Sequence, residues 1–129
     1  MSEEPPKVIG EYVAGASLAF GIVIVVQEVL GAYYAWTGIA PETISGEYLL
    51  AVFTIIHFVG GFLGGYLVRR RSGDKAIRAG FVTALMAFVI EFVYNFIFVR
   101  SFGGNLLALL SLVGGSIIGA FSASRGPPP

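Results

Sequence analysis

The stretch His57-Phe-Val-Gly-Gly-Phe-Leu-Gly-Gly-Tyr66 decides the fold, because it combines an apolar helix with two overlapping pairs of glycines four residues apart. Gly60 and Gly64 form one pair, and Gly61 and Gly65 form the other. Lipid tails are as apolar as leucine, so helices in a membrane associate where small residues let their backbones approach. The stretch therefore predicts a transmembrane helix that packs closely against its neighbours.

The composition of the whole chain agrees with a membrane location. Of its 129 residues, 56% are hydrophobic and 12% charged, 18 are glycine, and the mean hydropathy is +0.82. A small soluble domain could not bury that much apolar surface. The lack of cysteine and the single histidine exclude disulfides, thiolate metal sites and multi-histidine metal cages, so we expect no metal and no cofactor. Eight basic and eight acidic residues cancel, which leaves no broad footprint for nucleic acid.

Four stretches reach the about 20 apolar residues that a helix needs to cross a bilayer. They lack the alternating pattern of barrel strands, so helices are the physical solution. The predicted spans are roughly 12–36, 48–68, 79–99 and 104–123. They form a single integral membrane domain over 1–129, whose ends 1–7 and 125–129 we expect to be disordered. The predicted fold class is all-α, a four-helix transmembrane bundle.

The basic residues predict the orientation of the bundle. One short loop and its edges hold most of them, whereas the opposite loops hold one arginine. Because cytoplasmic loops are enriched in Lys and Arg, this loop and both termini should be cytoplasmic, in a prokaryotic cytoplasmic membrane, with the loop touching lipid headgroups. All loops are too short for a catalytic domain, so we expect no enzyme. The loop residues are Arg69, Arg70, Arg71, Lys75 and Arg78.

The two halves of the chain resemble each other. The glycine pattern of the second span recurs 54 residues later in the fourth, and Glu28 of the first span falls on Glu91 of the third. This predicts two tandem helical hairpins, related by a pseudo-twofold axis along the membrane normal. The packing glycines are Gly60, Gly61, Gly64 and Gly65 in the second span and Gly114, Gly115 and Gly119 in the fourth.

Each predicted span also carries a polar residue about 12 to 15 Å inside the same end of the bundle. Because a charged side chain at membrane depth costs several kcal/mol unless it faces protein or water, we expect these residues to face other helices. The expected buried polar layer consists of Glu28, His57, Glu91 and Ser111, with Gln27 and Asn95 within about a turn of it.

Two interpretations of this layer stay open. Two carboxyls close together in a low dielectric cannot both ionise easily, so Glu28 and Glu91 could carry a proton that His57 tunes, with Gln27 or Asn95 orienting a transported species. Alternatively, a neutral hydrogen-bonded layer holds the helices in register. A divalent metal ion is disfavoured because no Glu-x-x-His spacing is present.

Two resemblances add expectations. The stretch from His57 to Tyr66, followed by Gly80-Phe-Val-Thr-Ala84 and the Gly114-Gly115…Gly119 helix, resembles a family of small uncharacterised four-span, glycine-rich prokaryotic integral membrane proteins. This implies the four-helix fold and no particular activity. Glu28-Val29-Leu30-Gly31-Ala32 is similar to the first span of small multidrug resistance transporters, which implies that Glu28 binds substrate and protons. The second glutamate and the strong charge bias depart from that family.

These observations predict a structural or accessory subunit of a homo-oligomer or of a larger membrane complex, whose partners are lipids and other membrane subunits. The alternative is a proton-coupled transporter or channel that uses a buried Glu28/Glu91 pair.

Overall fold

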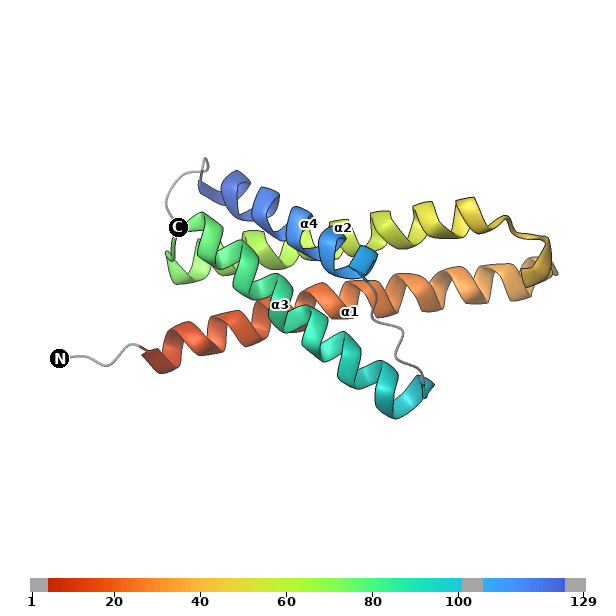
Figure 1. Cartoon of the computed structure of the whole chain (residues 1–129), viewed down its shortest axis with the longest axis horizontal. Helices are drawn as coiled ribbons and strands as arrows, with labels where there is room; N and C mark the ends of the chain where they lie inside the picture. Colours follow the sequence, from red (N-terminus) through yellow and green to blue (C-terminus); the bar gives the residue numbers. More distant parts are fainter. Residues whose placement is uncertain (1–4, 101–105, 125–129) are drawn as a thin grey trace.

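The computed structural model describes residues 5–100 and 106–124 and confirms an all-α, four-helix bundle (Figure 1). The four helices are α1 (Pro5–Thr37), α2 (Gly46–Ser72), α3 (Ala76–Tyr94) and α4 (Leu106–Ser124). A 3-10 turn, η1 (Pro41–Thr43), lies between α1 and α2, and a π-helical turn, η2 (Asn95–Val99), continues α3.

All four helices are long and apolar enough to cross a membrane, which makes the chain an integral membrane protein. The spanning segments are Ile9–Thr37, Gly46–Ser72, Ala76–Phe98 and Leu106–Ala123. Large apolar side chains such as Val25, Val89 and Leu110 are exposed on the outer surface, as lipid contact requires.

Two boundaries differ from the sequence prediction. Residues 5–7 are helical, so the expectation of disorder there is wrong; proline is well accommodated in a first helical turn, where its missing N–H has no partner to lose. Residues 1–4 and 125–129, and the predicted start of the last span at 104, lie outside the described residues.

The helix ends follow local sequence signals. The Ser45 hydroxyl caps α2 by accepting a hydrogen bond from the Tyr48 N–H at 3.0 Å. Gly73 ends α2 in the left-handed region, at φ 70°, where a side chain would be strained. The resulting tight connection returns the chain directly into α3.

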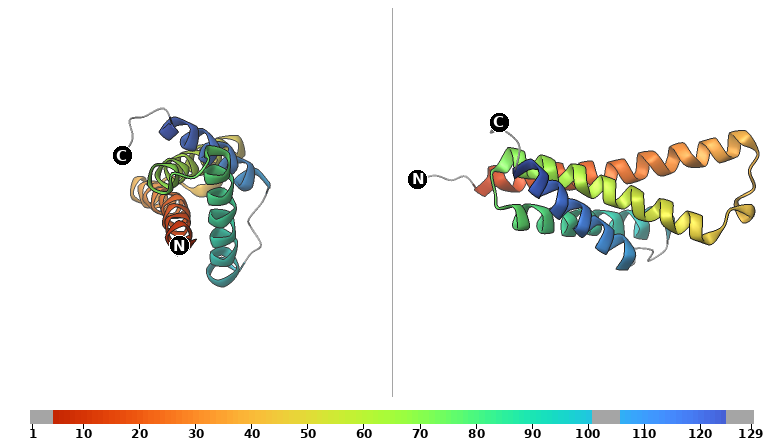
Figure 2. Two further views of the ribbon diagram at one scale, coloured as in Figure 1. Left: turned by 90° about the vertical axis from the view of Figure 1, so that its left-hand side faces the viewer. Right: turned by 90° about the horizontal axis from the view of Figure 1, so that it is seen from above.

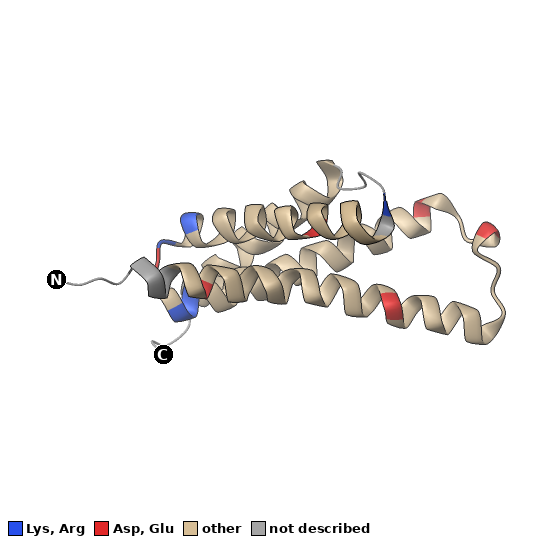
Figure 3. Cartoon of the chain, turned by 90° about the horizontal axis from the view of Figure 1, so that it is seen from below, with Lys and Arg blue, Asp and Glu red and all other residues tan. Residues whose placement is uncertain are grey.

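The end of the bundle where α2 stops and α3 begins is called the basic end below. There α1 also begins and α4 also ends, so α2 and α4 run in the same direction (Figure 1). Most Lys and Arg residues gather at this end (Figure 3). The cytoplasmic orientation of that end and the kind of host membrane stay predictions.

Helices α2 and α4 form the closest contact in the bundle, and glycines make it possible. A Cβ atom on Gly61 would lie 2.7 Å from the Leu112 carbonyl oxygen, and on Gly65 it would collide with the Ser116 backbone. The buried Ser116 hydroxyl donates a hydrogen bond of 3.0 Å to the Gly61 carbonyl across the same contact. The two backbones therefore touch directly, as the glycine spacing predicts.

The α2–α4 contact is reciprocal. Gly61 lies against Leu112, and Gly115 lies against Phe58. The 54-residue offset relates Gly61 to Gly115 and Phe58 to Leu112, so the two contacts are equivalent. Gly65 on Ser116 and Gly119 on Phe62 repeat the relation. A twofold relation of the hairpins would make the α2–α3 and α1–α4 contacts equivalent. They are not, because α2 packs against α3 whereas α1 and α4 share almost no contact among the described residues. The twofold relation of the complete hairpins stays a prediction.

The remaining predicted packing glycines divide into two groups. Gly60 and Gly64 pack on α1, where a Cβ would lie 2.6 Å from the Ala19 carbonyl oxygen and 2.7 Å from the Gly15 carbonyl oxygen, respectively. Gly114 is different, since a Cβ there would meet only the Phe58 ring at an ordinary 3.8 Å.

The α1–α2 hairpin extends past its neighbours. Figure 2 shows that α3 diverges from α1 and that both α3 and α4 stop short of η1. The part of the hairpin nearest η1, residues 27–37 of α1 and 46–53 of α2, is called the outer hairpin below; neither α3 nor α4 reaches its end at η1 (Figure 2).

Replacing Gly65 with alanine should weaken the bundle, whereas the same change at Gly114 should not. We expect Gly65→Ala to lower the free energy of unfolding by about 1–3 kcal/mol, because α2 and α4 must separate to admit the methyl group. Gly114→Ala should be neutral or stabilising by up to about 1 kcal/mol, because alanine favours the helix. Titration of both variants with a denaturing detergent, followed by circular dichroism, measures the difference; equal effects would contradict the close contact.

Candidate functional site

The candidate site is a buried pair formed by His57 of α2 and Glu91 of α3. The imidazole Nε2 lies 3.0 Å from Oε1 and 2.9 Å from Oε2 of Glu91. His57 is completely buried and Glu91 is 6% exposed. His57 precedes Gly60 and Gly61 by about one turn, so the close packing of that glycine face brings the imidazole into the core.

The second imidazole nitrogen fixes the protonation pattern of the pair. Nδ1 lies 2.8 Å from the Phe53 carbonyl oxygen, which can only accept a hydrogen bond, so Nδ1 carries a proton. Nε2 then either accepts the proton of a neutral Glu91 carboxyl or, as an imidazolium, donates to a carboxylate. In both states a single proton lies between His57 and Glu91, and the pair as a whole is neutral.

The surroundings make this neutrality important. His57 lies 12 residues before Arg69, about 18 Å along the helix, and therefore deep within the span. The Phe53 ring packs against the imidazole with 4.2 Å between ring centroids. Losing the shared proton, or gaining a second one, would leave a net charge among apolar groups, which is costly.

The other members of the expected polar layer do not join this pair. Glu28 and Gln27 are exposed on α1, so the prediction that they are buried with Glu91 in one polar layer is wrong. The physical reason for Glu28 is the face of α1 on which it lies: the buried residues Ala16, Ala19 and Val23 share one side of the helix, and Glu28 follows Val23 by five residues, about 140° around the axis. Ser111 is buried, and its hydroxyl donates to the Leu107 carbonyl of its own helix at 2.8 Å. Asn95 is half-buried at the start of η2.

Sequence reasoning missed one group of the site, the Phe53 carbonyl, and one buried hydroxyl about two turns before Glu91, that of Thr83. The Phe53 carbonyl has no sequence signature, because every residue carries one. Thr83 of α3 is completely buried, and its hydroxyl has no hydrogen-bond partner among the described residues. Its position on the Gly80–Ala84–Glu91 face of α3 was the available signal. No group of three His, Asp or Glu side chains in 5–100 or 106–124 is arranged to hold a metal ion.

A second polar cluster ties α1 to the α2–α3 connection at the basic end. The Tyr12 hydroxyl donates to Asp74 Oδ2 at 2.6 Å, and the Lys75 N–H donates to Asp74 Oδ1 at 2.9 Å. Burial raises the pKa of Asp74, but these hydrogen bonds and the charges of Arg78 and Lys75 outweigh it, so the pKa lies below its ordinary value. Asp74 therefore remains a carboxylate at neutral pH.

The predicted headgroup residues are partly engaged with the protein itself. Arg71 pairs with Glu11 of α1 at 2.8 Å. The Arg70 guanidinium donates to the Tyr66 hydroxyl at 3.2 Å and lies over its ring. Contact of these residues with lipid headgroups stays a prediction.

Comparison of the chain with protein-family models, with curated proteins and with solved structures finds no match. Both family resemblances drawn from the sequence therefore stay predictions, and the chemistry of the site has to be argued from its own geometry.

Removing the Glu91 carboxyl should cost far more than neutralising it. In Glu91→Gln the amide N–H can donate to Nε2 of neutral His57, so we expect a loss of about 1 kcal/mol or less. Glu91→Ala leaves a buried nitrogen unpaired beside a cavity, and we expect a loss of about 3 kcal/mol. Unfolding free energies in detergent micelles measure both. Equal losses would contradict a neutral, single-proton pair.

Proposed function

We propose that this chain is a structural or accessory subunit of a membrane assembly, and that the exposed face of α1 in the outer hairpin packs against a helix of another subunit, in the first instance a second copy.

The main support is the position of Glu28. Its side chain is exposed on α1, eight residues before Trp36 and thus about 12 Å inside the end of the span. A carboxyl that faces lipid at this depth costs several kcal/mol, whereas one that faces a second helix can form hydrogen bonds there. The single chain leaves this cost uncompensated.

Small residues on the same face give a second helix room to approach. Gly21, Ala32 and Ala35 lie at helical spacing from Glu28. A Cβ atom on Gly21 would meet nothing within 4 Å, in contrast to the glycines of α2 that pack inside the bundle. Backbone approach at small residues combined with a polar side chain is how membrane helices associate.

Site-specific photo-cross-linking in intact membranes tests this proposal. A photoreactive residue in place of Ala32 should form a protein adduct, of twice the monomer mass if the partner is a second copy. The same residue in place of the exposed Phe121 on α4 should label lipid alone.

The matched variants are Glu28→Leu, which should reduce the Ala32 adduct severalfold, and Glu28→Gln, which keeps the hydrogen bonds and should largely preserve it. If Ala32 labels lipid alone, as Phe121 should, the outer hairpin is not an interface and the proposal is wrong.

A second candidate function is proton transfer across the bundle, favoured by one observation: the buried His57 Nε2 lies within hydrogen-bond distance of both carboxyl oxygens of Glu91. An imidazole beside a carboxyl is suited to exchanging a proton. The chain becomes π-helical four residues after Glu91, in a form often found at functional sites, and the N–H of Asn95, the first residue of this turn, bonds to the Glu91 carbonyl.

Proton flux in liposomes that contain a pH-sensitive dye tests this second candidate. Flux above that of empty liposomes is expected for the native protein and should disappear in Glu91→Gln, because an amide cannot release a proton. Glu28→Gln is the matched control and should leave the flux unchanged, since Glu28 lies outside the pair. Absence of flux in the native protein, or equal flux in all three, would leave the pair with a structural role.

A further inference from the structure

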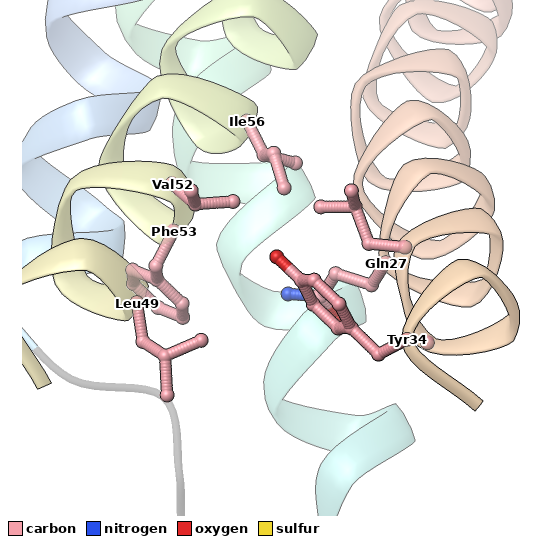
Figure 4. Close-up of a pocket in the computed structure, with 8 residues that line it drawn as sticks. Gln27, Tyr34, Leu49, Val52, Phe53 and Ile56 are labelled. Carbon is pink, nitrogen blue, oxygen red and sulfur yellow. The ribbon is translucent and has the colours of Figure 1, made fainter. Parts of the chain in front are cut away.

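A groove opens between α1 and α2 in the outer hairpin, with a volume of about 300 Å³. Its walls include Gln27, Gly31 and Tyr34 from α1 and Leu49, Val52 and Phe53 from α2 (Figure 4). This volume lies at the lower end of the range for small-molecule sites, about 300 to 1,000 Å³, and suits a ring system better than a whole lipid.

Two hydrogen-bonding groups point into this otherwise apolar groove. In Figure 4 the Gln27 amide and the Tyr34 hydroxyl reach from α1 toward the side chains of α2. The Gln27 amide makes no side-chain hydrogen bond within the described ranges. Tyr34 donates to the Tyr48 hydroxyl at 3.3 Å, which is long for a bond between two oxygens. The Tyr34 proton is thus already donated, and the Gln27 amide is the hydrogen-bond donor available to an occupant.

An amide that faces hydrocarbon without a partner carries a cost of a few kcal/mol, which a hydrogen-bond acceptor removes. The free N–H of the Gln27 amide is complementary to a carbonyl oxygen. We infer that the groove binds an apolar, membrane-soluble molecule that carries a carbonyl group, with its rings against Val52 and Phe53 and its oxygen facing the Gln27 amide.

Gly31 makes the space for this occupant. A Cβ at Gly31 would meet nothing within 4 Å, so a larger side chain would enter the groove without disturbing the packing of the bundle. The absence of a side chain there is not needed for contact between helices of this chain.

Two other grooves on the bundle lack this combination. One, bounded by Val13, Leu85 and Val89, offers apolar side chains and suits an acyl chain. The other contains Thr54, but its hydroxyl already donates to the Leu50 carbonyl at 2.9 Å. Thr54 therefore supplies a matched control at a similar depth.

Methyl NMR of the full chain in lipid nanodiscs tests the inference. The probes are menadione, an apolar two-ring molecule with two carbonyl groups, and 2-methylnaphthalene, which has the same rings and no oxygen. The chain has no cysteine with which a quinone could form an adduct. Menadione should shift the methyl signals of Leu49, Val52 and Ile56 in a saturable way, and 2-methylnaphthalene should not.

Variants identify the groups responsible. Gln27→Leu should weaken menadione binding about tenfold, the equivalent of one hydrogen bond. Gly31→Leu should abolish the saturable shifts by filling the groove, and Thr54→Val should leave them unchanged. If both probes bind equally, or if Gln27→Leu binds menadione as well as the native chain, the groove accepts any apolar molecule and the inference is wrong. These measurements report on the groove itself and do not depend on the proposed subunit role.

Discussion

The direct backbone contact between α2 and α4 is the constraint on which the rest of the bundle depends. In lipid, burial of apolar side chains adds little to helix association, so close van der Waals contact and hydrogen bonds have to provide it. Gly61, Gly65, Gly115 and Gly119 allow that contact, and the bond from Ser116 to the Gly61 carbonyl lies within it. Because main-chain atoms meet on both sides, the contact fixes the rotation of α2 as well as its height relative to α4.

Fixing the rotation of α2 also determines the chemistry of the core. His57 shares the glycine face, so the packing that buries Gly60 and Gly61 buries the imidazole too. Burial is tolerated because both ring nitrogens have partners, the Phe53 carbonyl and the Glu91 carboxyl. A buried ionisable group thus persists without net charge, and the single shared proton follows from the packing.

The sequence predicts the buried faces of α2 and α3 and fails on α1, for a physical reason. On α2 and α3 small residues recur along one face and mark the side that packs, which is how the burial of His57 and Glu91 could be predicted. Helix α1 is apolar on all sides, and of Gly15, Gly21 and Gly31 only Gly15 packs against a neighbour. Gly21 lies on the same side of α1 as Glu28 and suggested packing there, but the buried residues Ala16, Ala19 and Val23 lie on the opposite side of the helix.

The polar groups within the spans therefore differ in how they are satisfied. His57 and Glu91 are satisfied within one chain, whereas Gln27 and Glu28 are left exposed on the outer hairpin. Phe53 connects the two regions: its side chain lines the groove and packs on the imidazole, and its carbonyl holds Nδ1. The contacts of α2 with α4 involve Phe58, Gly61 and Gly65, closer to the basic end, so the segment around Phe53 is not held by that backbone contact. A displacement of the outer hairpin that moves Phe53 would thus weaken the hydrogen bond that keeps a proton on Nδ1. Nδ1 could then lose its proton, and the arrangement of one proton between His57 and Glu91 would no longer be fixed.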